Sequence, residues 1–221
     1  MHLHIAILDL DIPVPTVYAA RGLYSSQFTH LLAAAATRLS KSLNKEITIS
    51  TSSYDVIGGV FPPTHLLHPS PSSSPHHQVN EGRRETERID GILLTGSSAS
   101  VYRADTHPWI PSLQAFLAEV YMRYPHIKLF GSCFGHQMLA QVVVPGCVAE
   151  ACPSGYEVGI GGITLEKEFM AGFGFPFPLS LMLAERKKET RLQLQLIHGD
   201  WVVSDPGIVS SGTGVDLPGA F

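Results

Sequence analysis

Charge and cysteine are both scarce in this sequence. Charged residues make up 15% of the 221 residues and the formal net charge is -4. The chain therefore lacks the basic stripe with interleaved aromatic side chains that is typical of nucleic-acid-binding proteins. The 3 cysteines are too few for a disulfide scaffold and odd in number, which indicates a reducing cytoplasm. No phosphate-binding loop or dinucleotide fingerprint is present, so we expect no cofactor.

Long apolar runs are missing as well. No stretch approaches the length that a membrane span needs. The first residues lack the basic start and long apolar stretch of a signal peptide. Instead, 44% of the residues are hydrophobic, which suits a folded chain with one sizeable core and argues against disorder. We therefore expect a single domain over residues 1–221, with no membrane partner.

Strand-like and helix-like segments alternate along the chain. Strands are expected at 3–10, 47–56, 91–96, 127–130 and 192–197, and helices at 25–43, 108–124 and 135–144. The runs at 91–96 and 127–130 are short and continuously apolar, as in buried parallel strands. In the helix at 25–43, the apolar residues at helical spacing are Phe28, Leu31, Leu32, Ala35, Leu39 and Leu43. This order predicts an α/β fold, an open and mostly parallel sheet with helices on both faces.

Residues 62–88 have a different composition, rich in proline, serine and histidine and then in charge. Such a segment offers little apolar area to offset the entropy cost of ordering it, so we predict a flexible surface insertion. Its histidines, which could bind a metal, are His65, His68, His76 and His77. No regular element fixes their geometry, so we interpret them as residues of a solvated loop and expect no metal site.

A cysteine lies at the junction of a strand and a helix in Gly131-Ser132-Cys133-Phe134-Gly135. The spacing matches the G-x-nucleophile-x-G elbow, with cysteine in the place of the serine of hydrolases. A sharp strand-to-helix turn forces the nucleophile into a strained conformation and crowds the residues two positions away on each side. Glycine has no Cβ and fits at both positions. The pattern therefore predicts a nucleophilic thiol.

Cys133 is expected at a helix N-terminus, where unpaired N–H groups and the helix dipole stabilise a thiolate. The N–H of Phe134 would point to the place where a tetrahedral oxyanion forms. The alternative is a buried structural cysteine in a glycine-rich connection. The strand, the paired glycines and the helix in register favour the functional interpretation. We expect His136 to pack beneath the turn rather than to act in catalysis.

The segment from Gly131 to Gln137 resembles the G-x-C-x-G-H-Q elbow of the class I glutamine amidotransferases and matches it at every fixed position. Further segments resemble domains similar to that of GMP synthetase, in the family's own order: 90–98, 154–159 and 197–202. The chain departs from many members at Ser97 and Ser98, where they carry glycine and proline. The resemblance covers most of 3–202 and implies the flavodoxin-like class I amidotransferase architecture.

That resemblance implies hydrolysis of the side-chain amide of glutamine. Cys133 would attack the carboxamide carbon, ammonia would leave, and water would cleave the thioester. The implied oxyanion-binding and pocket residues are Gly96, Ser97, Ser98, Phe134, Gln137, His198 and Gly199. The implied partners are glutamine or a γ-glutamyl compound, and a separate synthase that accepts ammonia.

The general base of the family is a histidine followed two residues later by a glutamate, downstream of the segment that contains His198. No histidine follows His198, and the last glutamate is Glu189, so we expect a chain that is shortened at its C-terminal end and lacks this pair. His198 and Asp200 share the spacing, but their neighbours match the upstream segment. Two alternatives stay open, a γ-glutamyl peptidase and a catalytically inactive glutamine-binding or regulatory module.

Overall fold

The computed structural model describes residues 1–68, 88–164 and 191–204 of the chain. The chain divides into two compact units, each described separately below. Of the described residues, the first comprises 1–68, 88–150 and 202–204, and the second 151–164 and 191–201. The expectation of a single domain over 1–221 stays a prediction.

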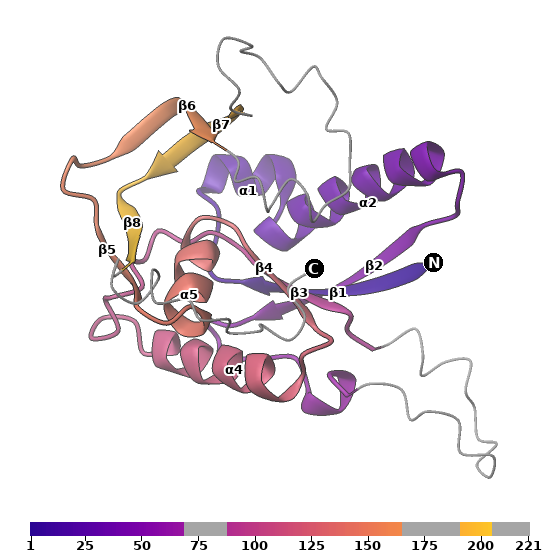
Figure 1. Ribbon diagram of the computed structural model, residues 1–221, viewed down its shortest axis with the longest axis horizontal. Coiled ribbons are helices and arrows are strands. Elements are labelled where there is room, and N and C mark those ends of the chain that lie inside the picture. The colour runs from indigo at the N-terminus through magenta and orange to yellow at the C-terminus, as the bar shows by residue number, and fades with distance from the viewer. Residues whose placement is uncertain (69–87, 165–190, 205–221) are drawn as a thin grey trace. The chain divides into compact units, whose positions relative to one another are not determined.

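The first unit is built around a parallel sheet of four strands in the order β2-β1-β3-β4 (Figure 1). The strands are β1 (His2–Asp9), β2 (Thr48–Asp55), β3 (Gly91–Leu94) and β4 (Lys128–Gly131). Residues of one face stay in register across the sheet, since Ile7 pairs with both Ser53 and Leu93. The predicted parallel α/β sheet is confirmed.

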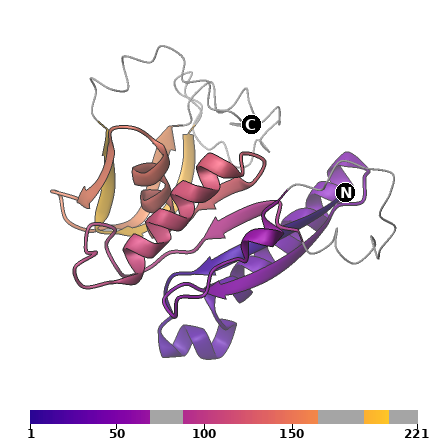
Figure 2. The same ribbon diagram turned by 90° about the horizontal axis from the view of Figure 1, so that it is seen from below.

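Helices cover both faces of this sheet, as the sequence predicted (Figures 1 and 2). The helices are α1 (Pro15–Arg21), α2 (Tyr24–Leu43), α4 (Trp109–Arg123) and α5 (Phe134–Val143), with a short 3-10 helix, η1 (Thr64–Leu66). Helix α2 contacts β1 and β2, whereas α5 contacts β3 and β4 and packs against α4. Since each crossover joins parallel strands, the loops that follow the strands meet at one edge of the sheet.

The hydrophobic core lies on the face that α4 and α5 cover. Alternate residues of β1 and β3 point into it, among them Leu8 and Leu94, which are fully buried. Helix α4 contributes residues at the predicted helical spacing: Ile110, Leu113, Leu117 and Val120. Burying each such side chain contributes about 1.5–3 kcal/mol relative to leaving it exposed. This core fixes the strands whose ends carry the site.

Two burial predictions are wrong. Strand β4 was expected to be buried, but it lies at the edge of the four-stranded sheet, and Phe130 is 60% exposed. In α2 the buried alanine is Ala36, whereas Leu31 is 59% exposed. The reason is that α2 packs over a polar strand face. The Thr29 and Thr51 hydroxyls lie 2.8 Å apart there, so the contact requires little apolar area.

The second unit contains an antiparallel pair, β6 (Glu157–Thr164) with β7 (Arg191–His198), in which Glu157 lies opposite His198. The strand expected at 192–197 is thus present as β7, while β6 was not predicted. Strands β5 (Cys147–Ala151) and β8 (Asp200–Ser204) form another two-stranded sheet, most of whose residues belong to the first unit.

The segment expected as an insertion at 62–88 is described only in part. The chain is regular through η1, and Leu67 is 1% exposed in the core, so the start of this segment is part of the folded unit. Residues 69–87, which include His76 and His77, lie outside the described residues. Within the described ranges, no helix is both long and apolar enough to cross a membrane.

Candidate active site

Cys133 lies in the turn between β4 and α5, at the N-cap position of the helix. Its backbone has φ 51° and ψ −112°, a combination that residues with a Cβ rarely adopt. The residue is exposed and its thiol is free. The strained conformation predicted from the glycine spacing is therefore present, and the sulfur is accessible to a ligand.

The two glycines of the turn are required by close backbone approaches. A β-carbon on Gly131 would collide with the backbone of Gly135 and with the His136 nitrogen. A β-carbon on Gly135 would lie 2.5 Å from Leu94 Cβ and 2.7 Å from the Leu94 carbonyl oxygen. Real β-carbon contacts are rarely this short, so only glycine lets α5 start against β3 and β4 and hold Cys133 in its strained conformation.

The first turn of α5 begins directly after Cys133. The Gly135 N–H donates to the Ser132 carbonyl at 2.9 Å, and the Gln137 N–H donates to the Cys133 carbonyl at 3.1 Å. Phe134 is the first helical residue, where an N–H has no intrahelical acceptor. Its ring is fully buried and lies 5.4 Å from the Trp109 ring, which anchors the helix start. The predicted role of the Phe134 N–H as an oxyanion donor stays a prediction.

The loop after β3 forms the other side of this site. A β-carbon on Gly96 would lie 3.6 Å from Cys133 Cβ, so the two backbones face each other closely. The Ser97 hydroxyl accepts the Ala99 N–H at 3.1 Å. The Ser98 N–H donates to Asp11 Oδ2 at 2.6 Å. The structure thus brings the predicted loop and the predicted thiol together within the first unit.

Sequence reasoning missed Asp11 and Tyr24. Burial raises the pKa of the Tyr24 hydroxyl, and the charges of Asp11 and Cys133 raise it further. Asp11 follows β1 and Cys133 follows β4, so both lie at the carboxyl edge of the sheet, and Tyr24 is the first residue of α2. No local pattern in the sequence marks either residue, since both come from the region after β1.

Two predictions concern the side chains that follow the turn. His136 was expected to pack beneath it, but His136 is exposed, which corrects that expectation. As the third helical residue it points away from the sheet on the solvent side of α5. Gln137 is 6% exposed, so its side chain belongs to the interior of the first unit.

His198 and Gly199 belong to the second unit. His198 Nε2 lies 3.2 Å from Glu157 Oε2, and Nδ1 donates to the Asp200 carbonyl oxygen at 3.0 Å. Asp200 thus meets this imidazole through its backbone. Gly199 accepts the Cys152 N–H at 2.8 Å, and a β-carbon there would lie 2.9 Å from the Tyr156 ring. Their predicted place in a glutamine pocket stays a prediction.

A separate hollow of about 210 Å³ lies between α2 and β2. It is lined by Ile7, Ser25, Ser26, Thr29, His30, Thr51, Ser52 and Ser53. None of these is a predicted site residue, so the hollow is not the site of the thiol. For metals, no group of three histidine, cysteine, aspartate or glutamate side chains within the described ranges could hold an ion.

Comparison with known proteins agrees with the resemblance seen in the sequence. The chain is 32% identical over 158 residues to a glutamine amidotransferase-like protein of Schizosaccharomyces pombe. That match covers 72% of this chain and 54% of the relative, so the chain spans about half of its length. A glutamine amidotransferase from Thermotoga maritima has the same fold, with a TM-score of 0.51, 16% identity and coverage of 92% of this chain and 64% of that one. No protein-family model matches the chain.

Proposed function

We propose that this chain, a class I glutamine amidotransferase-like protein, hydrolyses the side-chain amide of glutamine through a thioester on Cys133. One observation carries the proposal, which is the setting of Cys133. The residue is exposed, its backbone is strained at φ 51°, and it lies between the Gly96 loop and the N-terminus of α5. A buried structural cysteine would need none of these features. Nucleophiles in strand-to-helix elbows have all of them.

In the proposed reaction, the Cys133 thiolate attacks the γ-carboxamide carbon and a C–S bond forms. The carbonyl oxygen becomes an oxyanion, which the Phe134 N–H and the loop at Gly96 stabilise. The C–N bond breaks as the nitrogen takes a proton from solvent water, and ammonia leaves. Water then attacks the thioester, so the products are glutamate, ammonia and the free thiol. The ammonia would then pass to a separate synthase.

The test is covalent labelling by the chloroketone analogue of L-glutamine, followed by mass mapping. We expect labelling at Cys133, suppression of labelling by excess glutamine, and loss of labelling in Cys133→Ala. Cys147→Ala is the matched control, because Cys147 is a free, partly exposed thiol outside the turn. A wild-type chain that is folded and reacts with iodoacetamide at Cys133, yet ignores the chloroketone, would contradict the proposal.

Two activity assays separate the proposed reaction from its alternatives. Ammonia release from glutamine supports the amidotransferase-like reaction. Cleavage of a γ-glutamyl dipeptide with no ammonia release from glutamine identifies a γ-glutamyl peptidase instead. Glutamine binding that is unchanged by Cys133→Ala, with neither activity, identifies a binding module.

A further inference from the structure

The strand order of the first unit singles out one place at the carboxyl edge of the sheet. The chain leaves β1 for β2 on one side and later enters β3 on the other side of β1, so the topology switches between β1 and β3. In open parallel sheets, ligands bind at the carboxyl ends of the two strands beside such a switch. Asp11 follows β1 here, and the Gly96–Ser98 loop follows β3.

Asp11 bridges these two strand ends with both of its carboxylate oxygens. Oδ1 accepts the Ile12 N–H at 2.7 Å, and Oδ2 accepts the Ser98 N–H at 2.6 Å. Hydrogen bonds to a charged acceptor are shorter and about twice as strong as neutral ones. The first of these bonds fixes the carboxylate on its own turn, and the second ties the far end of the Gly96 loop to it.

The near end of the same loop is tied to β1 as well. The Thr95 N–H donates to the Leu8 carbonyl at 3.1 Å, and the Thr95 hydroxyl accepts the Leu10 N–H at 2.9 Å. Thr95 is fully buried, so this end is held by the sheet itself. Ser98, by contrast, is exposed, and Asp11 supplies its long-range bond. Asp11 therefore decides whether the exposed half of the loop is fixed.

We infer that Asp11 is a positioning residue, which holds the Gly96–Ser98 loop in the geometry that stabilises the oxyanion formed at Cys133. The inference rests on the proposed function. Oxyanion donors stabilise a transition state only when they are already in place, and a displacement of about 1 Å is costly. A β-carbon on Gly96 would lie only 3.6 Å from Cys133 Cβ, so movement of the loop at Ser98 alters the space beside the sulfur.

Tyr24 supports the placement of Asp11 in this site. It is the first residue of α2 and is partly buried, and its hydroxyl senses the charges of both Asp11 and Cys133. The bond from Ser98 to Asp11 and the close approach of Gly96 to Cys133 connect β1, the loop after β3 and the thiol after β4.

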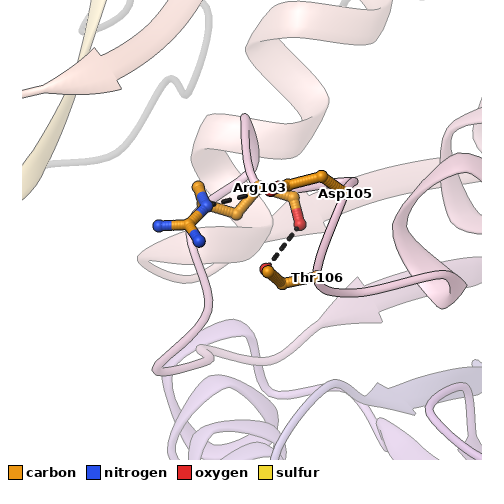
Figure 3. A network of polar contacts seen from close by, with 3 residues as sticks. All are labelled: Arg103, Asp105 and Thr106. Carbon is orange, nitrogen blue, oxygen red and sulfur yellow. Dashed lines mark hydrogen bonds and ion pairs between the residues drawn. The ribbon is translucent and has the colours of Figure 1, made fainter.

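The experiment compares two electrophiles on the full chain. The chloroketone analogue of L-glutamine places a ketone oxygen where the oxyanion forms, whereas iodoacetamide alkylates the thiol by displacement and needs no oxyanion donor. The variants are Asp11→Ala and Asp11→Asn, the second of which keeps the shape but loses one of the two acceptor oxygens. Asp105→Asn is the matched control, since Asp105 pairs with Arg103 at 3.3 Å in an exposed network that includes Thr106 (Figure 3).

We expect the maximal rate of chloroketone labelling to fall about 10- to 100-fold in Asp11→Ala and by a smaller factor in Asp11→Asn. In Asp105→Asn this rate should fall less than about 2-fold. The half-saturating concentration of the chloroketone should change little in all three variants. The iodoacetamide rate should change less than about 3-fold in all variants. The inference is overturned if Asp11→Ala lowers the labelling rates of both electrophiles equally, or if it leaves the chloroketone rate unchanged. A wild-type chain that the chloroketone ignores overturns the proposed function instead.

Hydrogen exchange at the Ser98 amide provides a readout that needs no activity. The bond to Asp11 should slow exchange at Ser98 in wild type and in Asp105→Asn, and exchange should accelerate about 10-fold or more in Asp11→Ala. Unchanged exchange at Ser98 would show that Asp11 does not hold the loop. Melting temperatures of the variants, measured alongside, verify that each chain is folded.

Discussion

The turn that holds Cys133 makes a quantitative prediction about Gly135. A methyl group there would lie 2.5 Å from Leu94 Cβ and 2.7 Å from the Leu94 carbonyl oxygen. Neither atom can move alone, because Leu94 lies in β3 and its carbonyl accepts the Ser132 N–H at 3.0 Å. Overpacking of this kind costs about 1–3 kcal/mol, and the higher helix propensity of alanine offsets at most about 1 kcal/mol. We therefore expect Gly135→Ala to lower the free energy of unfolding by about 1–2 kcal/mol.

Thermal unfolding measures this loss as a fall of about 2–8 °C in Tm. Gly96→Ala is the matched control, since its methyl group would meet Cys133 Cβ at an ordinary 3.6 Å and Gly96 has no left-handed φ. We expect Gly96→Ala to melt within about 2 °C of wild type, while chloroketone labelling slows because the methyl group fills space beside the sulfur.

The opposite ranking of these two variants would refute the packing argument. If Gly135→Ala has the Tm of wild type while Gly96→Ala is destabilised, the start of α5 does not pack against β3 as described. If both are stable and Cys133 reacts normally in both, the close approach does not hold the turn. Only the loss of stability at Gly135 with stability retained at Gly96 agrees with the contacts.

Three further predictions concern strain and charge. Cys133→Gly should be more stable than Cys133→Ala by about 1 kcal/mol in chemical denaturation, because glycine tolerates φ 51°; equal stabilities would argue against strain. Burial raises the pKa of Asp9, so its proton is held more tightly in the folded state, and the stability of wild type relative to Asp9→Asn should fall as pH rises above about 3.8; a constant difference in Tm across that range contradicts this. Asp11→Asn should lower the Tyr24 pKa, because it removes a charge that raises this pKa. The pKa is measured by tyrosinate absorbance, with the signal of Tyr24→Phe subtracted. An unchanged Tyr24 pKa would show that the Asp11 charge does not act on this hydroxyl.

Elements with a strong hydrophobic period were predictable from the sequence. Helix α4 buries the residues that its spacing indicates, among them Leu113 and Leu117, because a helix over a core must be apolar on one face. Strand β3 is buried throughout, as its continuous apolar run required. The same rule failed for β4, since an apolar run does not reveal which strand lies at the edge of the sheet.

The elements that were missed lack such a period. None of the seven residues of α1 is buried, so no apolar face marks it. Strand β6 contains Gly159, Gly161 and Gly162, which indicate a turn when taken alone. In the structure Gly161 lies beside β7, where an added β-carbon would require the end of the Leu196 side chain to turn aside. Strand β7 is distant in the sequence, so no local pattern reports this contact.

The two halves of the candidate site differ in the same way. The turn at Cys133 is encoded within seven consecutive residues, because strand end, nucleophile and helix start are neighbours in the chain. The support of the Gly96–Ser98 loop is not encoded locally, because Asp11 and Ser98 are 87 residues apart and meet only when β1 and β3 pair. A parallel sheet brings every loop after a strand to one edge, so a polar residue just after any strand can reach a nucleophile that follows another. Once the order β2-β1-β3-β4 is known, the residues after β1 and β3 are the ones to examine, and Asp11 is the carboxylate that the topology selects there.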